Sequence, residues 1–343
     1  MWYLKNKKAD VLYCGVDENK IKLVKTTINK NNIRHFYEYF TERYNIYKKK
    51  ELLKVDPPLT ENEILQKYKF TNVFRENDSG TKYVIRNICL RKNISFENKI
   101  LNIIIYRLFN KILTSEIYGM RESGIIDFNK FDDNEKETIR NKFNLIKELK
   151  PDYVFFTNAF NTGGVKQAAL KISKEKFIPL AIFDLVLSYK NKEKGIVEKI
   201  KKARDQREVF ISLCELNGIG KFLAYQIFVD FTYIPEFPFS ENEFVVAGPG
   251  CERGLNYLFE NRNGLTYEEC LFYLRDNQTK LFKQIDYDYY PDKLFDDRPK
   301  EERYLNVMAL ENCMCEFSKY MKTLTGKGRP RVKYKHKINK SPA

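Results

Sequence analysis

The sequence predicts a mostly α fold with a minor β contribution near the N-terminus. Stretches such as residues 33–54, 96–113 and 304–324 carry apolar residues at helical rather than alternating spacing. Capping and proline signals separate these stretches, as at Lys150-Pro151. We expect an N-terminal extension over residues 1–30, one compact helical domain over residues 31–325, and a basic tail over residues 326–343.

Composition favours a nucleic-acid partner. Hydrophobic residues make up 43% of the 343 residues, which is enough for a sizeable core. Lys and Arg number 61 against 46 Asp and Glu, a formal charge of +15. An excess of this size indicates a polyanionic partner, and nucleic acid is the commonest one. A Lys-, Asn- and Ile-rich genome would also contribute to it.

Cysteine and apolar patterns point to a soluble protein inside a cell. The seven cysteines include no CxxC pair, and the two histidines, His35 and His336, lie near opposite ends. No zinc site can be assembled from this set, so reduced thiols are expected. The sequence has no signal peptide and no run of 18 apolar residues, which argues against a membrane protein.

The first part of the chain reads as strands followed by helices. Residues 1–30 alternate loosely and suggest a short strand pair. Residues 33–54 form an amphipathic pattern that Asp56-Pro57-Pro58 breaks. Thr60-Glu61-Asn62-Glu63 then fits a capping box that would start the next helix.

Residues 69–83 hold the first candidate site. Asn72, Arg75 and Asp78 recur at a spacing of three, so on a helix they would share one side beside apolar residues. The alternative is a salt-bridged helix end, in which Asp78-Ser79-Gly80 is a stop and the next N-cap.

The middle of the chain is mainly core. Residues 96–113 form a strongly apolar helix, and residues 134–149 form another. Tyr153–Thr157 is a short β-like run that leads into Asn158–Gly164 and a helix from Val165. The Gly-Gly turn there could hold an anion, but it matches no Walker pattern, and ordinary capping is favoured.

The segment around which the chain is organised is Leu213–Phe231. It reads as a helix, a turn at Gly218-Ile219-Gly220, and a second helix that begins with Lys221. The turn glycines allow positive φ and expose backbone N–H groups at a helix N-terminus, where a phosphate binds well. This is the pattern of a helix-hairpin-helix at residues 205–231, which grips a nucleic-acid backbone. The alternative is an αα-hairpin in a helical core.

The last third supplies further candidates. Gly248-Pro249-Gly250 turns into a helix, and Cys251 at its N-terminus would have either a depressed pKa or a simple capping role. Residues 266–284 form one helix, and residues 304–324 form the last, with Glu311, Cys315 and Lys319 on one face. In the tail, Arg329 and Arg331 lie in a KGRPR segment that resembles a minor-groove hook.

Four linked motifs resemble one family. They are KFTNVFRENDSGTKY, NGIGKFLAYQIFVDFTY, FVVAGPGCERGL, and LENCMCEFSKY followed by GKGRPR. In order and spacing they are similar to the alpha-glutamyl/putrescinyl thymine pyrophosphorylases, a module also catalogued as the helical domain of 5-hydroxymethyluracil DNA kinases. The resemblance spans roughly residues 35–335. It implies a DNA-glycosylase-like helical fold and a role in building hypermodified thymines in phage DNA.

The activity that this resemblance implies is a transfer of an amine or amino acid onto a phosphorylated or pyrophosphorylated 5-hydroxymethyluracil in DNA. An extruded base would enter a pocket while the hairpin holds the backbone. The leaving charge needs cations and the amine needs a base. A divalent metal such as Mg²⁺ would suit a leaving pyrophosphate, but no ligand set can be named. The residues assigned to these roles are Arg75 and Lys221 for the leaving group, Asp78 and Asp230 as bases, Asn72 and Gln226 for the pyrimidine edge, and Glu311, Glu316 and Lys319 to complete the pocket, with Gly248, Pro249, Gly250 and Cys251 beside it.

Two other functions stay open at this point. A DNA glycosylase would excise a modified base, but glycosylases of this type usually carry an Asp where this chain has Ala247 and, in their lyase variants, a Lys where it has Phe222. Asp230 could in principle serve instead. A non-catalytic DNA-binding module is the other alternative. A kinase is disfavoured because the sequence contains no GxxxxGK[ST] loop.

Overall fold

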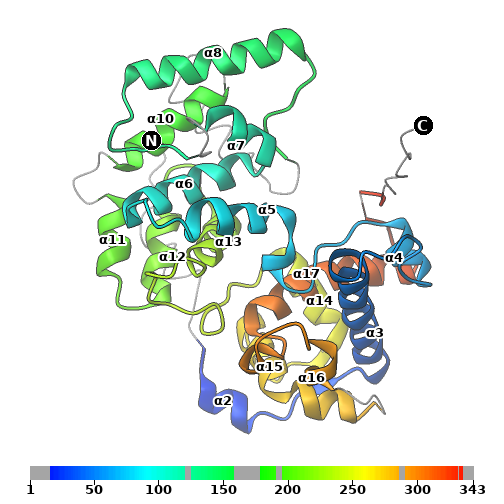
Figure 1. The fold of residues 1–343 in the computed structure, drawn as a ribbon. Helices are drawn as coiled ribbons and strands as arrows, with labels where there is room; N and C mark the ends of the chain where they lie inside the picture. Colours follow the sequence, from blue (N-terminus) through cyan, green and yellow to red (C-terminus); the bar gives the residue numbers. More distant parts are fainter. Residues whose placement is uncertain are drawn as a thin grey trace, which may run out of the picture. The chain divides into compact units, whose positions relative to one another are not determined.

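The computed structural model describes residues 16–119, 125–157, 178–190, 195–285, 290–330 and 332–334. Helices dominate these residues (Figure 1). The described strands form one two-stranded antiparallel sheet, in which β1 (Thr27–Ile28) pairs with β2 (Phe259–Asn261). The predicted mostly α fold is confirmed.

The described chain divides into two compact units. The first comprises Ser79–Phe244, and the second combines residues 16–78 with residues 245–334. The chain therefore passes from the second unit to the first and back again. The boundaries expected near residues 30 and 325 stay predictions.

The first unit is built around α6 (Phe96–Phe109), in which every residue from Asn98 to Phe109 is buried. The side chain of Ser95 caps its N-terminus, and Asn110 ends it with a left-handed φ of 51°. Helices α7, α10 and α13 pack against it. The described helices of this unit are α5 (Ser79–Val84), η3 (Ile85–Cys89), α6, α7 (Ile112–Tyr118), α8 (Asp133–Leu149), α10 (Ile178–Lys190), α11 (Ile196–Lys202), α12 (Gln206–Cys214) and α13 (Lys221–Phe231).

The predicted hairpin is formed by α12 and α13, which pack against each other. Asp205 caps α12 by accepting a hydrogen bond from the backbone N–H of Glu208. Gly218 has a φ of 83°, a conformation that strains any residue with a Cβ atom, and Gly220 is the N-cap of α13. The two helices and the glycine turn between them are therefore where the sequence predicted them. Contact of this hairpin with DNA stays a prediction.

The second unit is built around α17 (Val307–Leu324), which packs against α3, α4, α14 and α15. Aromatic rings of α17, α3 and α15 pack together. The ring centroids of Phe317 and Phe36 lie 5.3 Å apart in an edge-to-face contact, and those of Phe36 and Phe282 lie 6.4 Å apart. The other described helices of this unit are α2 (Glu18–Leu23), α3 (Lys30–Tyr47), η1 (Lys48–Leu52), α4 (Glu63–Lys67), η2 (Arg75–Asn77), α14 (Pro249–Leu258), α15 (Tyr267–Lys283), α16 (Pro291–Leu294) and η5 (Lys300–Glu302).

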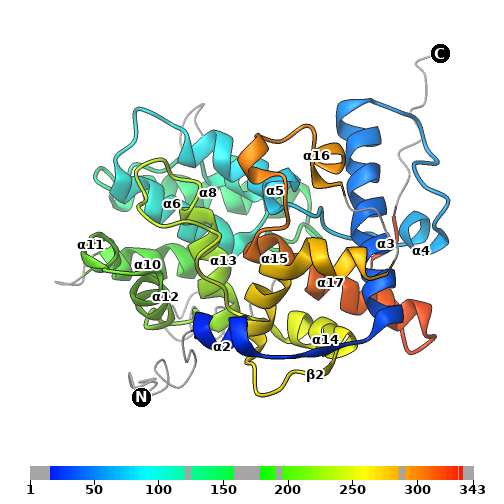
Figure 2. The ribbon, with the colours of Figure 1, turned by 90° about the horizontal axis from the view of Figure 1, so that it is seen from below.

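Two glycines let α14 lie against α17 at close range (Figure 2). A Cβ atom on Gly250 would stand 2.4 Å from the Sγ atom of Cys315. One on Gly254 would stand 2.2 Å from the backbone oxygen of Met314. The four-residue spacing places both glycines on one face of α14, so this face is a packing surface.

Local structure corrects several predictions. The strand at Thr27–Ile28 pairs with residues 259–261, far along the chain, while residues 1–15 of the predicted strand pair lie outside the described residues. Asn62, not Thr60, caps α4, because its side chain accepts hydrogen bonds from the N–H groups of Ile64 and Leu65. Residues 153–157 form no strand. The turn predicted at residues 158–164 lies outside the described residues.

The start of the basic tail is tied to the second unit. Tyr68 and Lys333 form an antiparallel bridge. The backbone N–H of Lys69 donates to the oxygen of Val332, and that of Tyr334 donates to the oxygen of Lys67, at 3.0 and 2.9 Å. Residues 332–334 are thus held by short β pairing, which was not predicted.

Candidate functional site

The loop before residue 79 brings Asn72 and Asp78 together without a helix. Only η2 (Arg75–Asn77), one turn of 3-10 helix, lies between them. Both the backbone N–H and the side-chain amide of Asn72 donate to Oδ1 of Asp78, each at 2.9 Å. The side-chain amide also donates to the oxygen of Asn77 at 2.9 Å. Asn72 and Asp78 therefore lie together, but not on one side of an α-helix as their spacing suggested.

Arg43 on α3 holds this loop from the other side. Its Nε donates to the backbone oxygen of Thr71 at 2.9 Å, and its Nη2 donates to that of Phe70 at 3.3 Å. The same Nη2 donates to Oδ1 of Asn72 at 2.7 Å. A planar guanidinium suits such a multiple contact because its donors are fixed in one plane.

Helix α17 completes the support. The side-chain amide of Asn312 donates to the backbone oxygens of Asn72 and Val73, at 2.6 and 3.3 Å. The N–H of Thr71 donates to Oε2 of Glu316 at 3.4 Å. The loop is therefore attached to two helices of the second unit.

Two carboxyl groups of this unit hold their protons more tightly than usual. Burial raises the pKa of the Asp78 carboxyl, while its hydrogen bond from Asn72 and the charges of Arg43 and Arg75 lower it. Burial raises the pKa of Glu311 to about 7, against the lowering effect of the Gly248 N–H and of Arg75. Such displaced pKa values are frequent at reactive sites, and also in structural ion-pair networks.

Cations lie beside these carboxyls. Arg75 is 7% exposed, and its positive charge acts on both Asp78 and Glu311. Glu316 is 5% exposed and pairs with Lys319, whose side chain is 45% exposed. Lys319 therefore pairs one turn along α17 with Glu316 rather than with Glu311, with which it was predicted to share a face.

The N-terminus of α14 faces carboxylates. The N–H of Gly248 donates to Oε1 of Glu311 at 3.4 Å, and the N–H of Ala247 donates to Oε1 of Glu268 at 2.9 Å. Cys251 is fully buried, and burial raises its pKa well above the ordinary value. A depressed thiol pKa at this position is therefore wrong, and the packing role of the small residues accounts for the motif.

The remaining two predicted pocket residues lie in the first unit. Asp230 on α13 is fully buried, and both of its carboxylate oxygens accept hydrogen bonds from Arg107, through Nη2 at 2.7 Å and through Nε. The Nη2 atom of Arg107 also donates to the hydroxyl of Thr81 at 3.2 Å. Gln226 on the same helix is 7% exposed.

Sequence reasoning missed four polar residues of these networks: Arg43, Glu268, Asn312 and Arg107. Arg107 carried a usable signal, since an arginine inside the apolar stretch 96–109 needs a buried partner. The other three lie on polar positions of ordinary amphipathic helices, where nothing in the pattern distinguishes them.

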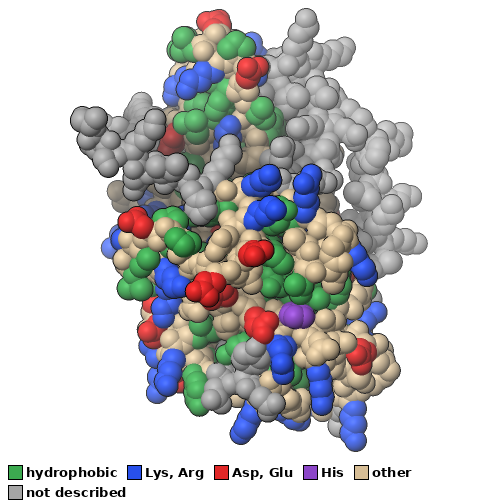
Figure 3. Space-filling model, turned by 90° about the vertical axis from the view of Figure 1, so that its right-hand side faces the viewer, with side chains coloured by type: hydrophobic (Ala, Val, Ile, Leu, Met, Phe, Trp, Pro, Cys, Tyr) green, Lys and Arg blue, Asp and Glu red, His purple; other side chains and the backbone are tan. Residues whose placement is uncertain are grey.

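The predicted DNA-contacting residues have varied surroundings. Gly220 and Arg329 are exposed, Lys221 is half-buried, and Ile219 is buried. Arg331 lies outside the described residues. On the face drawn in Figure 3, Lys and Arg side chains are spread among Asp and Glu rather than gathered in one patch.

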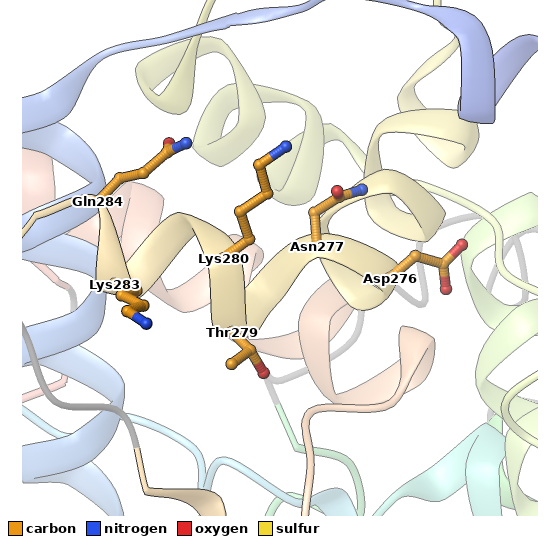
Figure 4. Close-up of a pocket in the computed structure, with 6 residues that line it drawn as sticks. All are labelled: Asp276, Asn277, Thr279, Lys280, Lys283 and Gln284. Atoms are coloured by element: carbon orange, nitrogen blue, oxygen red, sulfur yellow. The ribbon is translucent and has the colours of Figure 1, made fainter.

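Two surface depressions of the second unit are lined by residues outside the carboxylate cluster. One depression lies along α15 and is lined by residues from Asp276 to Gln284, whose side chains point to different sides of the helix (Figure 4). Another lies over residues 256–265. Within the described residues, no group of three or more His, Cys, Asp or Glu is arranged to hold a metal ion. No described helix has the length and apolar character needed to cross a membrane.

Comparisons with known proteins show the family to which the chain belongs. The model of the family described as "5-hmdU DNA kinase, helical domain" matches residues 30–329. The chain is 23% identical over 297 residues to a protein of Bacillus phage SP10 named "5-hmdU DNA kinase". The aligned region covers 83% of this chain and 44% of the relative. It thus spans less than half the length of that relative. No solved structure matches it. The family match covers most of the sequence, and the chain therefore belongs to the 5-hmdU DNA kinase helical-domain family.

Proposed function

We propose that this chain is a DNA base hypermodification enzyme that transfers an amine or amino acid onto a phosphorylated or pyrophosphorylated 5-hydroxymethyluracil. Family membership supports the substrate class, since the phage relative is named as a kinase of 5-hmdU in DNA. The observation that carries the proposal is the cluster in which Arg75 acts on two carboxyls of raised pKa, Asp78 and Glu311.

The cluster has the groups that such a displacement requires. The amine nitrogen attacks the exocyclic methylene carbon while the carbon–oxygen bond to the phosphate or pyrophosphate breaks, and the electron pair leaves with that oxygen. The attacking nitrogen loses a proton, which a carboxylate accepts. Arg75 and Lys319 supply positive charge for the oxygen that becomes negative.

Both carboxyls have properties of a proton acceptor. A general base works best when its pKa lies near the working pH, and burial brings the pKa of Glu311 to about 7. Asp78 is also raised, and it is half-buried rather than enclosed. We assign Asp78 as the base because it is the more accessible of the two, and Glu311 as a neighbour that tunes the charge of the cluster.

DNA contact belongs to the same proposal. The N–H groups that begin α13 and the charge of Lys221 would bind a backbone phosphate. A base in a duplex must be extruded before its 5-substituent can be replaced, so we propose base flipping as well. Arg329 in the exposed part of the tail would add a further phosphate contact.

A second candidate is a non-catalytic DNA-binding module. The specific observation in its favour is that the chain spans 44% of the kinase relative and lacks a GxxxxGK[ST] loop. A module of this kind would present DNA to a catalytic partner. The glycosylase alternative receives less support, because Asp230, the carboxylate available for it, is fully buried in an ion pair with Arg107.

The test is mass spectrometry of nucleosides released from treated DNA. DNA that contains 5-hydroxymethyluracil is first phosphorylated by a separate kinase and then incubated with this protein and a mixture of amines and amino acids. A mass gain on the thymidine-type nucleoside supports the transferase and identifies its donor. Free base with abasic DNA would instead show a glycosylase. Neither product, together with DNA binding that weakens with salt, would favour the binding module.

A further inference from the structure

A continuous series of hydrogen bonds joins α3 to Asp78. Arg43 donates to Oδ1 of Asn72 at 2.7 Å, and the amide of Asn72 donates to Oδ1 of Asp78 at 2.9 Å. The backbone N–H of Asn72 donates to the same Oδ1. Both bonds thus fall on one oxygen of the carboxylate, and among the described residues no group donates to Oδ2.

Both the amide group and the oxygen of the Asn72 side chain are engaged in hydrogen bonds within this arrangement. Its side-chain amide donates one hydrogen bond to the backbone oxygen of Asn77 and one to Asp78. Its side-chain oxygen accepts a hydrogen bond from Arg43. Both amide hydrogens are therefore engaged, and donating to a pyrimidine edge would require one of these bonds to break. The geometry therefore favours a structural link over the base-reading role that the sequence suggested for Asn72.

A capping role does not account for Asp78 either. It stands directly before Ser79, where α5 begins, a position at which an Asp side chain usually accepts from the first turn of the helix. Here the carboxylate accepts from Asn72, which lies behind it in the chain. Hydrogen bonds among the described residues thus attach the side chain to the loop.

We propose that Arg43 is a positioning residue for the transfer: through Asn72 it fixes Oδ1 of Asp78 and leaves Oδ2 directed to the proton of the incoming amine. This inference rests on the proposed function. In the step itself the N–C bond forms, the C–O bond to the leaving phosphate breaks, and the amine proton passes to Oδ2. Arg43 touches neither the substrate nor the reacting atoms.

Arg43 also contributes charge. Burial and the neighbouring Glu316 raise the pKa of Asp78, whereas the positive charges of Arg43 and Arg75 lower it. A proton acceptor must be ionised before the reaction, and the positive charge of Arg43 favours the ionised form of Asp78. Position and charge are separable effects, because a lysine keeps the charge but cannot reproduce the planar set of donors.

The experiment follows the titration of Asp78 directly. Protein labelled with ¹³C at the Asp carboxyl carbons is titrated by NMR, and the Asp78 signal is identified by its absence in Asp78→Asn. In Arg43→Gln we expect the Asp78 signal to titrate at higher pH than in the wild type, and the acid limb of the kcat/KM profile to move with it. In Arg43→Lys we expect the titration to return toward the wild-type position while kcat stays lowered by about tenfold or more, as expected for a misplaced group.

Arg34→Gln is the matched control, since Arg34 is an exposed residue on the same helix. Its titration and its activity should equal those of the wild type. An Asp78 titration that is unchanged in Arg43→Gln, in a protein that melts like the wild type, would overturn the link. If the Asp78 titration shifts in Arg43→Gln but the wild-type protein transfers no amine, the link between Arg43 and Asp78 stays in place and its role in proton transfer is overturned. This outcome separates the failure of the link from the failure of the proposed function.

Discussion

Arg107 and Asp230 form a buried ion pair inside the first unit, where their side chains are 4% and 0% exposed. Two donors of the guanidinium meet both oxygens of the carboxylate, which is the geometry that best offsets the loss of water around two charges. Removing one partner leaves the other charge buried and unneutralised.

Arg107→Ala should therefore destabilise the protein by about 3–5 kcal/mol, as is typical when one half of a buried pair is lost. Urea unfolding followed by circular dichroism measures this. Arg204→Ala is the control, because Arg204 pairs with Glu208 but is 87% exposed, and its loss should leave the unfolding midpoint unchanged. Equal midpoints for Arg107→Ala and the wild type would contradict the account of this pair.

The close contact of α14 and α17 predicts a steric effect. A methyl group at residue 254 would collide with the backbone of Met314, which cannot move aside as a flexible side chain would. Gly254→Ala should cost about 1–3 kcal/mol of unfolding free energy. Gly220→Ala has open space around its Cβ atom and should show only the cost of an alanine at a helix N-cap, about 0.5–1 kcal/mol. A melting temperature for Gly254→Ala equal to that of Gly220→Ala would show that the helices separate easily.

The packing glycines also illustrate what the sequence could predict. Helices 134–149, 266–284 and 304–324 were expected and agree with α8, α15 and α17 within a few residues, because their apolar spacing and caps are local signals. The spacing of Gly250 and Gly254 was equally visible, but its meaning depended on which helix would lie opposite. That information is not local.

The candidate site shows the same limit. The spacing of Asn72 and Asp78 singled out two residues that hydrogen-bond to each other, although a loop with one turn of 3-10 helix brings them together rather than an α-helix. Arg43 lies 29 residues before Asn72 in the chain, so no pattern in the sequence could connect the two. The raised pKa of Glu311 depends on burial by neighbouring helices, which only the packed structure reveals.

The raised pKa of Glu311 leads us to expect that the stability of the protein depends on pH. The folded pKa of Glu311, about 7, lies above its ordinary value, so the folded state binds the proton more tightly than the unfolded state. The stabilisation from the protonated group is complete at pH values below the unfolded pKa, declines as pH rises toward 7, and is lost above it. Glu311→Gln imitates the protonated form and should be more stable than the wild type at pH 8, by an amount on the order of 3 kcal/mol.

Unfolding midpoints at pH 5 and pH 8 test this prediction. The advantage of Glu311→Gln should be large at pH 8 and small at pH 5, where both proteins carry a neutral side chain. Asp292→Gln provides a control, since the Asp292 side chain is 69% exposed in the same unit. A constant difference at both pH values would show that the carboxyl of Glu311 titrates normally.

If the hairpin of α12 and α13 binds DNA, a substitution in it should lower the affinity for DNA. Lys221→Ala should weaken binding to duplex DNA uniformly across sequences, by several-fold at moderate salt, and lower the slope of log affinity against log salt by about 1. Fluorescence anisotropy over a series of salt concentrations measures both quantities. Lys130→Ala is the matched control, because Lys130 is an 82% exposed lysine of the same unit outside the hairpin. Equal loss of affinity in the two variants would mean that the hairpin has no special part in binding.

Nucleoside mass spectrometry of wild type, Asp78→Asn and Asp292→Asn tests most directly whether Asp78 accepts a proton during amine transfer. All three proteins are given the same phosphorylated 5-hydroxymethyluracil DNA and the same mixture of donors. We expect the mass gain with the wild type and with Asp292→Asn, and a loss of at least about 100-fold in Asp78→Asn, the lower range for removal of a general base. Undiminished product from a correctly folded Asp78→Asn protein would contradict the proposed site.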